Sequence, residues 1–318
     1  MKCLLTLAAT ALLCIIGAGL APAVIAPTAY GSMVTRLSTP APTTRAPTIT
    51  TPAASDDTAP AAPVAAVTPP ADQATTAATT AKQADHAMHA VLPKVQDGFE
   101  VFDLQTGTVL TSNNAGQQFA AMSVVKLLIA LDALARDNWL IPDGATQQQI
   151  RQMLADSDDE IADGLWTAGG GPAIVTRMAG RLGLTGTQPP DDPGEWGDTL
   201  ITPRDMVTVY RYIAEQVPGP DRDLLLGALS GAPRIAADGF NQYFGIPDGM
   251  PHTTWAIKQG WGTSGSQAVM DSTGLVGPDL RYVVVVLASA PANSYSTVPA
   301  AVTAGAGELA GLVGSAGS

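Results

Sequence analysis

Cysteine is nearly absent from this chain. Its 318 residues include only two cysteines, Cys3 and Cys14, and both lie in the apolar stretch that follows Met1-Lys2. If this stretch is removed as a leader, the protein that remains has no disulfide and no thiol chemistry. A disulfide framework and cysteine catalysis are therefore excluded for the rest of the chain.

Positive charge and histidine are also scarce. The 16 lysines and arginines are outnumbered by 28 aspartates and glutamates, which gives a net charge of −12. No basic run is interleaved with aromatic residues, so nucleic acid is not an expected partner. No His/Cys cluster has the spacing of metal ligands. His86 and His89 lie three apart in a predicted helix and could chelate, but we interpret them as surface histidines and expect no metal and no cofactor.

Lysine is the remaining route to an activated hydroxyl. No Gly-x-Ser-x-Gly elbow is present, and His252 lies in a Pro-rich loop, which argues against a serine–histidine triad. Ser123-Val124-Val125-Lys126 opens an apolar run, and residues three apart share one helix face, so the Lys126 amine can reach the Ser123 oxygen. A serine in the first turn also lies where free backbone N–H groups stabilise a developing negative charge. The alternative is a plain serine near a helix start with a solvated lysine, because such a tetrapeptide arises by chance about once in a chain this long.

Two later segments favour the catalytic interpretation. Ser157-Asp158-Asp159 follows a helical stretch, and Lys258-Gln259-Gly260-Trp261 ends an apolar, strand-like run. With the first segment they resemble, in the same order, the Ser-x-x-Lys, Ser-Asp-Asn and Lys-Thr-Gly boxes of the serine β-lactamase and penicillin-binding protein superfamily. The resemblance covers residues 98 to 309. More narrowly, the chain is similar to class A β-lactamase-related, alanine-rich secreted mycobacterial proteins, some of them lipoproteins.

The resemblance implies a role for each of four polar side chains. Ser123 would be the nucleophile that accepts the acyl group, and Lys126 its general base or proton relay. Ser157 would pass a proton toward the leaving amine. Lys258 would supply the second cation that lowers the pKa of Lys126, and it would attract an acidic terminus of the substrate.

The resemblance also implies a substrate-binding set of Asp159, Gln259, Gly260 and Trp261. The backbone N–H groups of Ser123 and Trp261 would form the oxyanion hole. Asp159 stands where the family has asparagine, cannot donate a hydrogen bond and would raise the pKa of Lys126. Gln259 replaces a small hydroxyl residue; its amide could donate to a ligand, but it is bulkier.

The segment expected to activate the deacylating water also departs from class A enzymes. Residues 188–197 form a short loop without the glutamate and following Leu-Asn of that class. Glu195 is the one glutamate nearby, and we interpret it as a solvated loop residue. Rapid turnover of β-lactams is therefore not expected.

The chain divides into three expected segments. Residues 1–23 read as a signal peptide with Ala21-Pro22-Ala23 as its cleavage site, and a retained membrane anchor is the alternative. Lipidation at Cys14 is not expected, because the preceding Leu13 is too large for lipoprotein processing. Residues 24–80, rich in Thr, Pro and Ala, predict a disordered linker. Residues 81–318 would form a β-lactamase-like domain, secreted or held in the cell envelope.

Strand-like runs at both ends of that domain, with helical segments between them, predict an α/β fold, and the family resemblance implies a β-lactamase-like one. We expect an antiparallel five-stranded sheet flanked by helices, and an all-helical lobe. The predicted strands cover residues 98–104, 106–110, 254–260, 267–276 and 281–289. The predicted helices cover residues 73–92, a segment opening at Ser123, 147–155, 172–181, 203–216, 221–229 and 298–313.

Three functions remain open on the sequence. The first is an exported serine hydrolase or acyl transferase, expected to be monomeric, acting on a β-lactam, a peptidoglycan-derived peptide or a small ester or amide; a glutaminase-like amidohydrolase is a variant disfavoured by export. The second is a non-catalytic cell-wall ligand-binding protein in which Asp159 pairs with Lys126. The third is a structural envelope protein with relic boxes.

Overall fold

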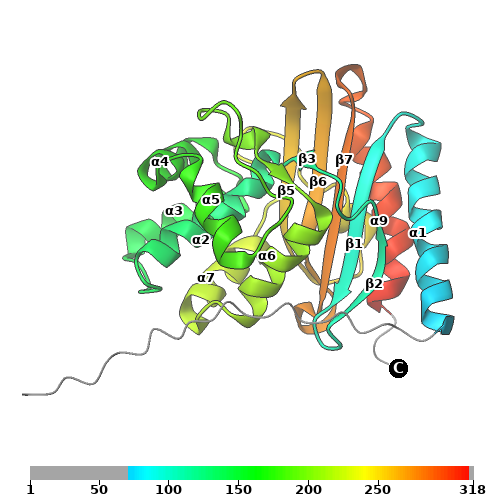
Figure 1. Cartoon of the computed structure of the whole chain (residues 1–318), viewed down its shortest axis with the longest axis horizontal. Helices are drawn as coiled ribbons and strands as arrows, with labels where there is room; N and C mark the ends of the chain where they lie inside the picture. Colours follow the sequence, from blue (N-terminus) through cyan, green and yellow to red (C-terminus); the bar gives the residue numbers. More distant parts are fainter. Residues whose placement is uncertain (1–70, 315–318) are drawn as a thin grey trace, which may run out of the picture. The chain divides into compact units, whose positions relative to one another are not determined.

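Five antiparallel strands form the central sheet of the computed structural model, which describes residues 71–314 (Figure 1). The strand order is β2-β1-β7-β6-β5. Because β7 lies between β1 and β6, strands from both ends of the described chain share one sheet, and β5 lies at an edge. The strands are β1 (Gln96–Asp103), β2 (Thr108–Asn113), β5 (Trp255–Ser264), β6 (Gln267–Val276) and β7 (Tyr282–Pro291).

Two helices cover one face of the sheet (Figure 1). They are α1 (Ala71–Val91) and α9 (Val298–Gly314), from the two ends of the described chain. Val284 and Val286 of β7 belong to the hydrophobic cluster on this side, whereas Val283 and Val285 belong to the cluster on the opposite side. Both faces of β7 are therefore buried, which explains why its sequence is a continuous apolar run.

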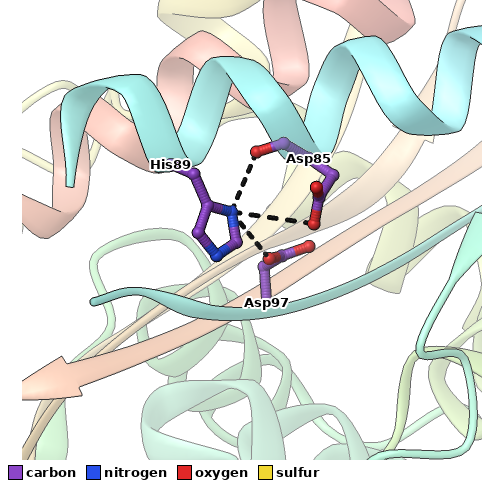
Figure 2. Close-up of side chains that lie close together, drawn as sticks. All are labelled: Asp85, His89 and Asp97. Carbon is purple, nitrogen blue, oxygen red and sulfur yellow. Dashed lines mark hydrogen bonds and ion pairs between the residues drawn. The ribbon is translucent and has the colours of Figure 1, made fainter. Parts of the chain in front are cut away.

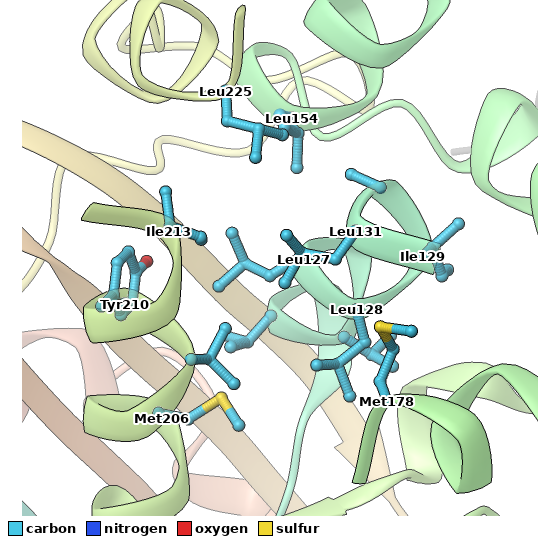
Figure 3. Packing of buried hydrophobic residues seen from close by; sticks show 14 of the residues in the cluster. Leu127, Leu128, Ile129, Leu131, Leu154, Met178, Met206, Tyr210, Ile213 and Leu225 are labelled. Carbon is cyan, nitrogen blue, oxygen red and sulfur yellow. The ribbon is translucent and has the colours of Figure 1, made fainter. Parts of the chain in front are cut away.

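The helical lobe packs on the other face. Its centre is α2 (Lys126–Arg136), which is buried on nearly every side, as expected of a helix that is apolar all round. Figure 3 shows Leu127, Leu128 and Leu131 of α2 among side chains from four other helices. The surrounding helices are α3 (Gly144–Ala155), α4 (Asp159–Gly169), α5 (Ala173–Leu182), α6 (Pro203–Glu215) and α7 (Gly219–Ser230).

The predicted fold class is confirmed, with differences in detail. Helix α1 begins at Ala71 and so extends into the segment assigned to the linker. Helix α4, the short helix α8 (Ile246–Gly249) and the two-residue strands β3 (Phe119–Ala120) and β4 (Leu200–Ile201) were not predicted. Ser123 lies in a 3₁₀ turn, η1 (Met122–Val125), directly before α2 rather than in its first turn.

The predicted signal peptide, Cys14 and most of the predicted linker lie outside the described residues. Within residues 71–314, no helix has both the length and the apolar character needed to cross a membrane.

Candidate active site

The turn that carries Ser123 is fixed on both sides. Strand β3 pairs with β4, and the Ala121 N–H donates to the Thr199 carbonyl at 2.7 Å. In a 3₁₀ turn, side chains three residues apart are eclipsed, so Ser123 and Lys126 are aligned. The Lys126 Nζ lies 2.8 Å from the Ser123 Oγ, as the spacing of the tetrapeptide predicts.

The second polar segment lies at the turn between α3 and α4. Ser157 adopts a left-handed backbone conformation (φ 58°), a strained arrangement that is common at functional sites. Asp158 caps α4, because its carboxylate accepts from the Ile161 N–H at 3.1 Å. This turn directs both oxygens of Ser157 at Lys126, whose Nζ is 2.8 Å from the carbonyl and 3.3 Å from the hydroxyl.

Lys258 reaches the same place from the edge strand β5. Its Nζ donates to the Ser157 Oγ at 2.9 Å and to the carbonyl of Gln259 at 3.0 Å. The Ser157 hydroxyl therefore lies between two lysine amines, one of which contacts the Ser123 hydroxyl. The structure brings together the four residues to which the sequence assigned catalytic roles.

Both amines are shielded from solvent, which changes their protonation. Lys126 is 0% exposed and Lys258 is 1% exposed. Burial lowers the pKa of Lys126, against the opposing pull of the Asp159 carboxylate. Burial, reinforced by the charge of Lys126, lowers the pKa of Lys258 well below its ordinary value. A neutral amine beside the Ser123 hydroxyl is thus accessible, and a neutral amine is what a general base requires.

Asp159 opposes that state. It is the first residue of α4, and its Oδ1 lies 2.5 Å from the Lys126 Nζ while the side chain as a whole is 63% exposed. An ionised carboxylate at this distance stabilises the protonated amine. The expected pairing of Asp159 with Lys126 is present, but burial outweighs it, so the pKa of Lys126 is lowered and not raised.

Ser123 opens into a cleft of about 520 Å³. Trp196 and Trp261 line it, as expected if the chain has the family layout. The Lys126 Nζ lies 4.7 Å from the Trp196 ring centroid, which places this ring as a cover over the amine. Glu195 also lines the cleft and is exposed, as predicted for a solvated loop residue.

One expectation about the ligand is wrong. The Gln259 side chain does not line the cleft: it is buried, and its amide donates to the carbonyls of Gln242 and Phe244 at 3.1 and 2.7 Å. Successive strand residues point to opposite faces, so Gln259 faces away from the side that Lys258 occupies. Lys258, for its part, is buried against Ser157 and does not line the cleft, so its attraction of an acidic substrate terminus remains a prediction.

The cleft contains acidic residues that the sequence did not single out. Asp163 accepts from the Trp196 indole N–H at 2.8 Å, and Asp238 accepts from the Trp261 indole N–H at 2.9 Å. These partners are 33 and 23 residues apart in the chain, so no local pattern could have identified them.

Gly260 allows β5 to approach the turn that carries Ser123. A Cβ at this position would lie 2.7 Å from the Ala121 carbonyl oxygen and 3.2 Å from the Met122 Cβ. The first of these contacts is with backbone, which cannot yield without moving the turn. The close approach keeps Lys258 within reach of Ser157.

We therefore expect Gly260→Ala to lower the free energy of unfolding by about 1–3 kcal/mol through overpacking. Chemical denaturation measures this loss. Gly116→Ala is the matched control, because a Cβ at Gly116 meets nothing within 4 Å. Equal stability of the two variants would show that the approach of β5 to the turn is loose.

One group of side chains, within the part of the chain that the structure describes, has metal-donor atoms close together. Asp85, His89 and Asp97 meet between α1 and β1, as Figure 2 shows, with donor atoms within 4.8 Å of one another. The His89 Nδ1, however, lies 3.0 Å from the Asp85 main-chain carbonyl. A carbonyl only accepts, so Nδ1 carries the proton and has no lone pair for an ion. His86 is exposed and takes no part, and the absence of a metal remains a prediction.

Comparison with known proteins identifies relatives of this chain in mycobacteria. No protein-family model matches it. It is 35% identical over 211 residues to proteins of Mycobacterium tuberculosis and Mycobacterium bovis named "Putative lipoprotein LppW". The match covers 64% of this chain and 66% of theirs, just under two thirds of their length. Their name agrees with the expected location, secreted or in the cell envelope.

Solved structures show the fold. A class A β-lactamase from Bacteroides cellulosilyticus aligns with a TM-score of 0.57 at 14% identity, covering 73% of this chain and 99% of its own. A mutant of PBP-A, solved as an acyl-enzyme complex with penicillin G, aligns with a TM-score of 0.57 at 19% identity, covering 73% and 96%. The chain therefore has the fold of serine β-lactamases and penicillin-binding proteins, the fold that its three sequence boxes predict.

Proposed function

We propose that this protein is an exported serine hydrolase or acyl transferase that forms an acyl-enzyme at Ser123. The observation that carries the proposal is the chain of contacts from the Ser123 Oγ to Lys126 (2.8 Å), from Lys126 to the Ser157 Oγ (3.3 Å) and from there to Lys258 (2.9 Å). It joins a nucleophile to two buried amines at the bottom of a cleft.

The geometry supports a simple proton path. When the Ser123 Oγ bonds to a carbonyl carbon, its proton moves to the neutral Lys126 amine. Ser157, which contacts both amines, then passes a proton to the departing nitrogen or oxygen as the carbonyl bond to the leaving group breaks. Ser123 and Trp261 both line the cleft, and their backbone N–H groups are proposed to hold the oxyanion.

The substrate class proposed is a β-lactam, a peptidoglycan-derived peptide, or a small ester or amide. Glu195 is the glutamate at the cleft and stands outside the motif that activates the deacylating water in class A enzymes. Deacylation is accordingly proposed to be slow, so the protein would bind penicillins covalently and be a weak β-lactamase.

The ion pair between Lys126 and Asp159 favours a second candidate. A carboxylate 2.5 Å from the amine stabilises the charged form, in which Lys126 cannot accept a proton. In this alternative the protein binds a cell-wall ligand in the same cleft without reaction.

Intact-mass spectrometry separates the two candidates. The purified protein is incubated with a panel of penicillins and activated esters, beside the Ser123→Ala variant. A mass increase equal to one acyl group in the wild type, and none in the variant, supports the enzyme. Retained muropeptide binding with no mass increase supports the ligand-binding protein.

A further inference from the structure

Acidic side chains dominate the cleft above Ser123. The lining contains no lysine, arginine or histidine. It contains five carboxylates, which belong to Asp159, Asp163, Glu195, Asp198 and Asp238. Asp159 is paired with Lys126. Within residues 71–314, no ion pair joins the other four to a basic side chain. The wall of the cleft therefore carries an uncompensated negative charge.

The two tryptophans on the wall offer little to an anion. The Trp196 indole N–H already donates to Asp163, and the Trp261 indole N–H already donates to Asp238. Trp261 is also stacked on Phe240, at 4.9 Å between ring centroids and 11° between planes, so its position is fixed. A carboxylate entering here would meet fixed negative charge and find both indole donors already occupied.

The cations of the site do not reverse this field. Lys126 is neutralised by Asp159 at its side, and Lys258 is fully buried against Ser157, with a pKa well below its ordinary value. Neither lysine is among the residues that line the cleft. The electrostatic preference of the open cleft is set by its carboxylates.

We infer that the substrate accepted at Ser123 carries a positive charge, such as a protonated primary amine near the scissile carbonyl, rather than a carboxylate. The reaction at Ser123 is taken from the proposed function, on which this inference rests. The charge of the substrate is inferred from the four carboxylates that have no basic partner. Like-charge repulsion disfavours anionic acyl donors in the same cleft without excluding them, so penicillins, which carry a carboxylate, should acylate Ser123 more slowly than neutral or cationic esters.

A binding experiment tests the charge without any reaction. Three amides of similar length differ in their far end: ε-aminocaproamide is cationic, caproamide is neutral and adipic acid monoamide is anionic. We expect the wild-type protein to bind the cation about tenfold more tightly than the anion at low salt, with a smaller difference at high salt. Ligand-observed nuclear magnetic resonance measures the order. Equal binding, weaker binding of the cation than of the anion, or no binding of the cation would overturn the inference.

Variants identify the source of the preference. Asp163→Asn with Asp238→Asn removes two charges and keeps an oxygen to accept from each indole. We expect this variant to lose most of the preference for the cation. The control, Asp223→Asn with Glu308→Gln, removes two charges from exposed positions on α7 and α9 and should keep it. An unchanged preference in the cleft variant would contradict the inference.

A reaction experiment separates this inference from the proposed function. It uses the p-nitrophenyl esters of ε-aminocaproic acid and caproic acid and the mono-p-nitrophenyl ester of adipic acid, which match the three amides. We expect Ser123-dependent release of p-nitrophenol to follow the same order, cation first. If none of the esters acylates Ser123, the proposed function fails while the binding order still decides the charge preference. If the anionic ester reacts fastest, the inference fails and the proposed function stands.

Discussion

Lys126→Met should slow acylation of Ser123 by a factor of about a thousand or more. The Lys126 Nζ lies 2.8 Å from the Ser123 Oγ and is the one amine that contacts this oxygen among the described residues. General-base assistance of this kind contributes about 10²–10⁴ in rate. Burst-phase release of p-nitrophenol from an activated ester measures the acylation step directly.

The same variant should remain folded. Methionine has a similar length to lysine, and the Asp159 carboxylate that loses its partner is 63% exposed, so water can solvate it. The melting temperature is therefore expected to fall only slightly. Lys94→Met, at an exposed position before β1, is the control for a lost lysine charge. A folded Lys126→Met protein that acylates at the wild-type rate would assign the base to another group.

Asp159→Asn should accelerate acylation by about tenfold or more near neutral pH. The carboxylate 2.5 Å from the Lys126 Nζ stabilises the charged amine, so its removal lowers the pKa of Lys126 further. Each unit of that fall raises the neutral fraction about tenfold at a pH well below the pKa. The amide also adds a donor that the carboxylate lacks.

The acceleration by Asp159→Asn should depend on pH. Acylation requires neutral Lys126, so its rate rises as pH increases through the pKa of that amine. In Asp159→Asn the rising limb should move to lower pH, and the two proteins should converge at high pH. If Asp159 instead serves only to hold α4 in a binding protein, the variant would lose thermal stability and gain no reactivity.

The sequence predicted the fold because its periodic segments are long. The continuous apolar run of β7 predicts a strand that is buried on both faces, and the structure places it between two hydrophobic clusters. Helix α4 was not predicted because Asp158 and Asp159 were interpreted only as part of the Ser157-Asp158-Asp159 motif. They are also an N-cap and an acidic first turn, and Gly170 is a left-handed C-terminal residue.

The site was predictable to the extent that single elements align its residues. The three-residue spacing placed Lys126 against Ser123, and the strand end placed Lys258 nearby. The family resemblance predicted a ligand-binding role for Gln259. In a pleated strand, however, the neighbours Lys258 and Gln259 point to opposite faces. The acidic wall was not predictable, because its residues come from separate loops and helices and meet only in the folded chain.

The most direct test is to locate the site of covalent modification. The protein is treated with a fluorophosphonate, digested and mapped by tandem mass spectrometry, beside Ser123→Ala and Lys126→Met. We predict a single adduct on the Ser123 hydroxyl, absent from the first variant and strongly reduced in the second. No adduct on Ser123, or adducts on other residues that persist in Ser123→Ala, would contradict the assignment of this hydroxyl as the nucleophile.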